Sequence, residues 1–147
     1  MRPMNQDELI RRFETNTMPE DSFHHADHVR LGFAYLSQYP PLEALDKFSA
    51  ALKRYAAARG KFQLYHETIT HAYFFLIRER MARALAIDSQ GVHSRNINSR
   101  TINWDEFVRR NPDLLAWKNG ILTRYYHETT LQSELARRVF VFPDKFA

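Results

Sequence analysis

Residues 23–28 read Phe-His-His-Ala-Asp-His and form the densest group of side chains that could do chemistry. On an α-helix, residues three or four positions apart share a face, so His28 can converge on one ion with either His24 or His25. His24 and His25 lie about 100° apart around the helix axis, so only one of them is expected to point at that ion. Neutral imidazole nitrogens suit transition metals and need no thiolate partner. Two histidines leave such a site incomplete.

Residues 65–71 read Tyr-His-Glu-Thr-Ile-Thr-His and supply the best candidate for a third ligand. A site made of His25, His28 and His66 has three nitrogens and keeps a coordination position open, as a catalytic metal requires. The predicted cofactor is a divalent transition metal (Zn, Fe, Ni or Mn). Glu67 is expected to complete the shell or to act as a base on metal-bound water, and Tyr65 to donate to a developing anion. Glu67 and His71 form an alternative ligand pair.

These side chains also have a purely structural interpretation. Histidines near the start of a helix often cap it or face solvent, and threonines such as Thr68 and Thr70 can bond to the preceding turn. Asp27 is expected either to orient an imidazole or to place a favourable charge near a helix N-terminus. The tetrapeptide Tyr-His-Glu-Thr occurs at 65–68 and again at 126–129, followed by different residues, which favours coincidence over duplication.

The segments Phe23-x-His25-x-x-His28 and 65–70 resemble those of a group of small bacterial all-helical proteins to which no activity is attached. The resemblance extends to residues 125–126 and 135–137, so it spans most of the chain, and it favours His25 over His24. Two known helical metal families fit less well. Phosphohydrolases with a His-Asp dipeptide differ because this chain reads Asp27-His28, and DinB-like bundles place a single histidine before a close pair, the reverse of the order here.

The apolar periodicity predicts an all-α fold: one domain over 1–147, a compact bundle of about five to seven helices. The clearest amphipathic stretch follows Pro41 and ends at Gly60, with apolar residues at steps of three and four: Leu42, Leu45, Phe48, Leu52 and Tyr55. Two further helices are expected before residue 40: one begins at Asn5, and the next begins near Asp21 or Ser22. Four more are expected over 66–85, over 104–110, over a short stretch that begins at 111, and over 122–140. Residues 139–142 are expected to dock as a tail. Residues 88–103 are rich in Ser, Asn and Arg and predict one long polar loop.

Composition excludes several classes of protein. The chain has 147 residues and a net charge of +4. It contains no cysteine, so disulfide frameworks and thiolate nucleophiles are excluded. The sequence has no apolar run long enough to predict a membrane span. Its first residues are polar and do not resemble a signal peptide, so a cytoplasmic location is expected. No phosphate-binding glycine loop, nucleophile-elbow serine or HExxH pair occurs. No recognisable module predicts nucleic-acid binding.

Three hypotheses about function follow. The leading one is a metal-dependent enzyme that acts on a small molecule at the histidine site. The second is a non-enzymatic binding or regulatory module whose arginines (Arg95, Arg100, Arg109, Arg110, Arg124, Arg137 and Arg138) contact an anionic partner. The third is a metal-free apolar pocket lined by Phe33, Tyr35, Tyr73 and Phe74. The oligomeric state stays open at this level.

Overall fold

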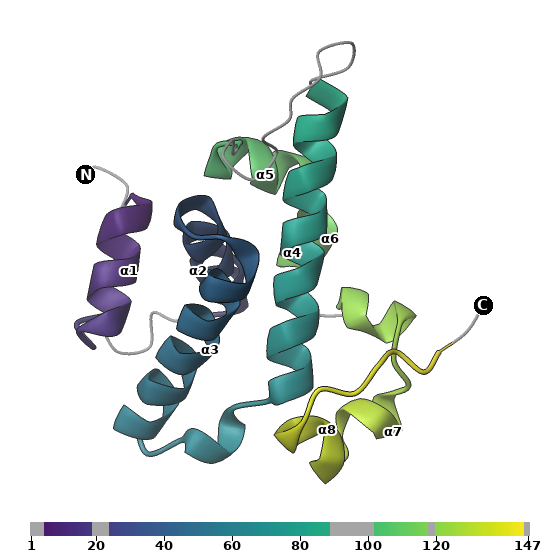
Figure 1. The fold of residues 1–147 in the computed structure, drawn as a ribbon. Helices are drawn as coiled ribbons and strands as arrows, with labels where there is room; N and C mark the ends of the chain where they lie inside the picture. Colours follow the sequence, from purple (N-terminus) through teal and green to yellow (C-terminus); the bar gives the residue numbers. More distant parts are fainter. Residues whose placement is uncertain (1–4, 19–23, 89–101, 118–119, 146–147) are drawn as a thin grey trace.

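A computed structural model describes residues 5–18, 24–88, 102–117 and 120–145, and it is all-α over these ranges. Five helices have seven residues or more, and three further α-helices of four or five residues bring the described total to eight, one more than the largest number predicted. The elements, shown in Figure 1, are α1 (Gln6–Glu14), α2 (His25–Gln38), α3 (Pro41–Ala58), η1 (Phe62–Leu64), α4 (Glu67–Asp88), α5 (Trp104–Arg110), α6 (Pro112–Leu115), η3 (Ile121–Arg124), α7 (Glu128–Leu131) and α8 (Glu134–Arg138).

Helix α2 is the centre of the fold. It packs against α1, α3, α4 and α6, and as a result all six side-chain positions from 31 to 36 are buried, on every side of the helix. Gly32 sits where α2 comes closest to its neighbours, since a Cβ placed there would lie 3.0 Å from Cδ1 of Ile77 and 3.6 Å from Phe48. Helix α4, the longest, runs along the other side of this core (Figure 1).

Short side chains fix the helix starts as the sequence suggests. The Asn5 side chain accepts from the backbone N–H of Glu8 at 2.8 Å, which confirms the first predicted helix start. The start of the second helix is later than predicted: α2 begins at His25, while Asp21 and Ser22 lie outside the described residues. The Asp27 carboxylate accepts from the backbone N–H of His24 at 2.9 Å, so Asp27 stabilises this helix N-terminus.

The predicted loop 88–103 falls mostly outside the described residues, which resume at Ile102. Asp88 still belongs to α4, whereas the Asn103 side chain accepts from the backbone N–H of Glu106 at 2.8 Å and begins α5. Helix α5 has the bounds expected from the sequence. In the described part of the chain, no helix is both long and apolar enough to cross a membrane.

The prediction of one last helix over 122–140 is wrong. This stretch forms three short helical segments, η3, α7 and α8, and then turns back on itself. Tyr126 is buried and donates through its hydroxyl to the carbonyl of Val141 at 2.7 Å, and Asp144 accepts from the backbone N–H of His127. Ser133 caps α8 by accepting from Ala136. These local caps and the folded-back tail outweigh the helical propensity of the segment.

The C-terminal tail docks on the start of α4, as expected. The hydroxyl of Thr68, which is fully buried, donates to the carbonyl of Val139 at 2.8 Å. The same oxygen accepts from the backbone N–H of Val141 at 3.1 Å. One threonine therefore satisfies two backbone groups of the tail and holds it against α4.

Candidate functional site: a histidine-lined cavity between α2 and α4

Folding brings the two histidine-bearing segments to one cavity of about 600 Å³. His25 and His28 reach it from the first turns of α2. His24 and His66 reach it from the residues just before α2 and α4. The remainder of the lining is mostly apolar and comes from α2, α3, α4 and the segment around α6: Ala26, Val29, Phe48, Leu52, Leu64, Ile69, Thr70, Tyr73, Ile77, Leu115 and Trp117. The cavity therefore has an imidazole-rich wall and an apolar floor.

His25 presents one ring nitrogen as an acceptor. Its Nε2 lies 2.9 Å from the carbonyl oxygen of Leu114, and a carbonyl only accepts, so Nε2 carries the proton and Nδ1 keeps its lone pair at neutral pH. The ring packs against Tyr73 and Trp117, with centroid distances of 4.8 and 5.1 Å. Burial lowers the pKa of His25, although the hydrogen bond to Leu114 opposes the shift. The ring is held neutral and oriented.

His28 lies one turn further along α2. Burial lowers its pKa to about 4, and the neighbouring His25 contributes in the same direction. More than a third of the residue is nevertheless accessible to solvent. His28 lines a cavity that is open to solvent, so water there screens a charge on this ring.

His66 has a structural role. Its Nδ1 accepts from the backbone N–H of Ile69 at 3.1 Å and so caps the first turn of α4. Its Nε2 must then carry the proton, and it donates to the carbonyl of Leu131 at 2.7 Å. Both ring nitrogens are engaged, so a metal ion could bind His66 only in place of one of these bonds. Burial lowers the pKa of this histidine too.

The repeated Tyr-His-Glu-Thr segment has a structural explanation. In both copies the glutamate is the first residue of a helix, α4 or α7, and the histidine immediately precedes it. His66 is buried, whereas His127 is exposed and its backbone N–H donates to Asp144. The echo in the sequence thus marks two helix starts and does not mark two sites.

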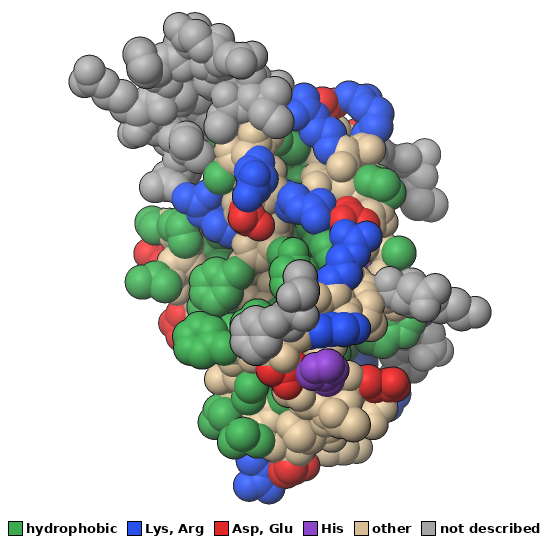
Figure 2. Space-filling view, turned by 90° about the vertical axis from the view of Figure 1, so that its right-hand side faces the viewer, with side chains coloured by type: hydrophobic (Ala, Val, Ile, Leu, Met, Phe, Trp, Pro, Cys, Tyr) green, Lys and Arg blue, Asp and Glu red, His purple; other side chains and the backbone are tan. Residues whose placement is uncertain are grey.

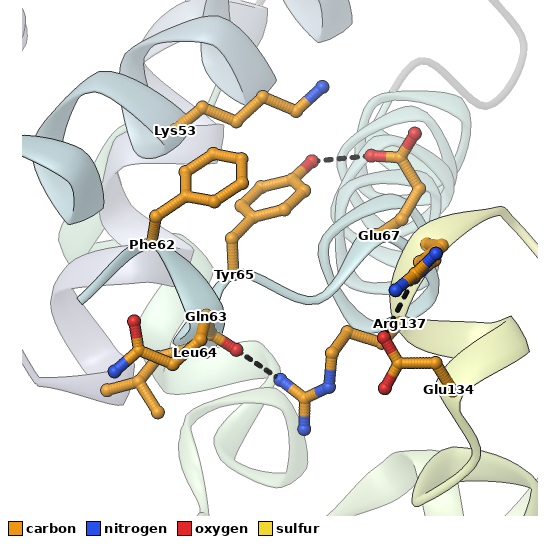
Figure 3. Close-up of a pocket in the computed structure, with 9 residues that line it drawn as sticks. Lys53, Phe62, Gln63, Leu64, Tyr65, Glu67, Glu134 and Arg137 are labelled. Atoms are coloured by element: carbon orange, nitrogen blue, oxygen red, sulfur yellow. Dashed lines mark hydrogen bonds and ion pairs between the residues drawn. The ribbon is translucent and has the colours of Figure 1, made fainter.

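Tyr65 and Glu67 do not reach the histidine cavity. They line a second pocket between η1, α4 and α8, shown in Figure 3. There the Tyr65 hydroxyl donates to Oε1 of Glu67 at 2.7 Å, and burial together with this bond raises the pKa of Tyr65. His71, the alternative partner of Glu67, has its Nδ1 2.9 Å from the Glu67 carbonyl oxygen and 3.7 Å from Oε1. The structure does not place the predicted base beside the three histidines.

No group of three or more His, Asp or Glu side chains in the described ranges is arranged to hold a metal ion. The predicted apolar pocket also differs from what the structure contains. Phe33, Tyr35 and Phe74 are fully buried in the core, and of the four residues named only Tyr73 lines the cavity.

Sequence reasoning missed the contacts that hold α6 beside α4. Arg80 of α4 donates to both carboxylate oxygens of Asp113, at 3.1 and 2.9 Å, and to Oδ1 of Asn111 at 2.8 Å. These bonds hold α6, whose Leu114 carbonyl orients the His25 ring. The Asn111-Pro112-Asp113 sequence signals a helix start, but nothing in it points to a distant arginine.

Comparison with known proteins adds no family to this description. No protein-family model, curated protein or solved structure compared with the chain matches it.

The lowered histidine pKa values predict a pH dependence of stability. The pKa of His28 is about 4 in the folded chain and 6.5 in the unfolded chain. Between these pH values the unfolded chain binds a proton that the folded chain does not, so falling pH favours unfolding. The contribution of His28 is complete above pH 6.5 and is lost as the pH falls from 6.5 towards 4. We expect the free energy of unfolding, measured with urea at several pH values, to decline over this window. The free energy of unfolding of His28→Gln should decline less steeply with falling pH than that of the unsubstituted protein. Parallel curves for the two proteins would contradict the assignment to His28.

Proposed function

We propose that the protein binds a small, mainly apolar molecule in the cavity between α2 and α4, and that the imidazole wall recognises a hydrogen-bond donor on that molecule. The observation that carries this proposal is the lining itself. Histidines from two segments that are about forty residues apart in the sequence meet over a floor that includes Val29, Leu52 and Ile77.

The chemistry of the wall defines the ligand. A volume of about 600 Å³ lies within the range of about 300–1,000 Å³ typical of small-molecule sites. The Nδ1 lone pair of His25 is an acceptor, because Nε2 already donates to Leu114. A neutral imidazole attracts a hydroxyl or N–H donor and gives no ionic attraction to a carboxylate. The expected ligand is an uncharged molecule such as a substituted phenol, with its ring on the apolar floor.

Matched phenol and ether probes test this proposal. We expect 4-propylphenol to bind more tightly than 4-propylanisole, which has the same ring but no donor, by about tenfold or 1.4 kcal/mol. Binding is followed by NMR through the indole N–H of Trp117, which borders the cavity, after its signal has been assigned with Trp117→Phe. Equal affinities for the two probes, or no shift of this signal, would contradict the proposal.

The variants His25→Leu and His127→Leu provide the control. Both remove an imidazole, but His127 is exposed and lies outside the cavity. We expect His25→Leu to abolish the preference for the phenol and His127→Leu to keep it. Circular dichroism establishes that each variant is folded before its affinity is compared.

A metal-dependent enzyme is the second candidate, favoured by the meeting of His25, His28 and His66 at one cavity. It requires His66 to exchange its bond to Ile69 or Leu131 for a metal bond. Metal analysis of protein purified without a nickel column tests it. A stoichiometric transition metal that is lost in His28→Ala would support an enzyme of this kind, and a content below about a tenth of an equivalent in both proteins would count against it.

An arginine-rich surface for an anionic partner receives less support. Arg109 and Arg110 pair with Glu106, and Arg138 pairs with Glu134. Arg137 differs from these, because it donates to the uncharged backbone carbonyl of Gln63. Arg124 lies 4.0 Å from Asp113, and Arg95 and Arg100 fall outside the described residues. Figure 2 shows carboxylates interspersed among the basic side chains of one face. Such pairing leaves little concentrated positive potential for a nucleic acid or an acidic protein.

A further inference from the structure

The second pocket, which contains Tyr65 and Glu67, is a site of its own. It has a volume of about 690 Å³ and lies between η1, the start of α4, and α8. Leu64 is the single residue that lines both this pocket and the histidine cavity. Figure 3 shows the rings of Phe62 and Tyr65 on one side of the pocket and Arg137 on the other.

The charges of this pocket are not balanced. Its lining includes three basic side chains, Lys53, Arg137 and Arg138, and two acidic ones, Glu67 and Glu134. Glu134 pairs with Arg138 at 2.8 Å. Glu67 accepts from the neutral Tyr65 hydroxyl and keeps its negative charge, so the charged side chains of the lining sum to a formal charge of +1. Lys53 and Arg137 have no ion pair with a carboxylate of the described ranges.

Arg137 is oriented without being neutralised. Its Nη1 donates to the backbone carbonyl of Gln63 at 2.6 Å, which fixes the planar guanidinium between α8 and η1. A carbonyl carries no charge, so the full positive charge remains, and the guanidinium offers four further N–H donors. Lys53 is half-buried and lies over the Tyr65 ring, with Nζ 5.2 Å from the ring centroid.

The pocket also exposes apolar surface. Phe62 is 55% exposed and Leu64 is 65% exposed, and both line it. Covering such side chains favours a complex because it removes apolar surface from water. Flat aromatic side chains beside a fixed, uncompensated guanidinium suit a ligand that has an aromatic body and one negatively charged group.

We propose that this pocket binds a small aromatic carboxylate, whose carboxylate contacts the Arg137 guanidinium while its ring lies against Phe62 and Tyr65. Arg137 anchors the carboxylate through paired N–H donors, as guanidinium groups do with planar anions. Lys53 adds positive charge at the same opening. The ligand differs in charge from the neutral molecule expected in the histidine cavity.

Calorimetric titration with 2-naphthoate and its neutral amide, 2-naphthamide, tests this site. We expect the acid to bind and the amide to bind at least about tenfold more weakly, and we expect added salt to weaken binding of the acid. Equal binding of acid and amide would overturn the proposal, and so would the absence of naphthoate binding at low salt.

Three charge variants identify the anchor. Arg137→Gln is expected to weaken naphthoate binding by about tenfold, and Lys53→Gln by a smaller factor. Arg109→Gln is the control, because Arg109 lies outside the pocket. Unchanged naphthoate affinity in Arg137→Gln would overturn the assignment. If circular dichroism shows that Arg137→Gln does not fold, the affinity of Lys53→Gln for naphthoate decides, and an unchanged affinity again counts against the site.

The variant His25→Leu tests whether the anion binds in the histidine cavity instead. We expect it to leave naphthoate binding intact, and loss of binding in this variant would place the anion in the histidine cavity and overturn the proposal.

Discussion

Phe33→Ala is expected to lower the free energy of unfolding by about 3–5 kcal/mol, because it removes a large side chain from the centre of the fold. Phe33 has no exposed surface, and its ring contacts Trp104 and Phe107 at centroid distances of 5.3 and 5.1 Å. These contacts join α2 to α5. An alanine leaves a void that the surrounding helices can fill only in part.

Urea denaturation of Phe33→Ala and Phe75→Ala compares the same substitution at a buried and at an exposed position, so any difference in stability reports on burial. Phe75 lies on α4 and is 45% exposed, so its removal should cost less than about 1 kcal/mol. The difference between the two variants should therefore exceed about 2 kcal/mol. Similar losses for both would mean that α2 is not the tightly packed centre of the protein.

Periodicity predicted the long helices because each one buries a stripe that the sequence shows. In α3, Phe48 and Leu52 are buried one turn apart, as their spacing indicates. The same spacing wrongly includes Leu42, which lies in the first turn of α3 and is 77% exposed. Helix starts could be predicted from side chains that accept a hydrogen bond from a backbone N–H three residues later, as Asn5 and Asn103 do. Both signals are local, so a single sequence contains them.

The errors arise where distant contacts decide the structure. Residues 122–140 contain enough helix-forming residues for one helix, yet the bond from Tyr126 to Val141 and the caps at His127 and Ser133 divide the stretch. None of these contacts has a periodic signature. The start of α2 is a different case, because a local bond decides it: Asp27, inside the helix, accepts from the backbone N–H of His24.

The candidate site was predicted in part. The sequence indicated that the two histidine segments belong together, and the structure has His25, His28 and His66 at one cavity. It could not indicate how α4 is rotated about its axis, which depends on packing against α2, α3 and α8. That rotation turns Tyr73 towards the histidines and Glu67 towards the second pocket.

Thr68→Val is expected to lower the free energy of unfolding by about 2 kcal/mol and to release the C-terminal tail. The substitution keeps the shape of the side chain but removes the hydroxyl that donates to Val139 and accepts from Val141. The two backbone groups of the tail then lose their partner, at about 1–3 kcal/mol for each group that stays buried. Val139 is partly exposed, so its carbonyl can turn to water, and this keeps the expected cost near the lower end of the range.

The second Tyr-His-Glu-Thr copy supplies the matched control. Thr129 occupies the position equivalent to Thr68, but it is exposed, so Thr129→Val should change stability by less than about 0.5 kcal/mol. Limited trypsin digestion reports on the tail directly, because Arg137 and Arg138 immediately precede it. Cleavage there should be faster in Thr68→Val than in Thr129→Val. Equal cleavage rates would show that Thr68 does not hold the tail. The bonds from Tyr126 to Val141 and from the backbone N–H of His127 to Asp144 would then be its anchors.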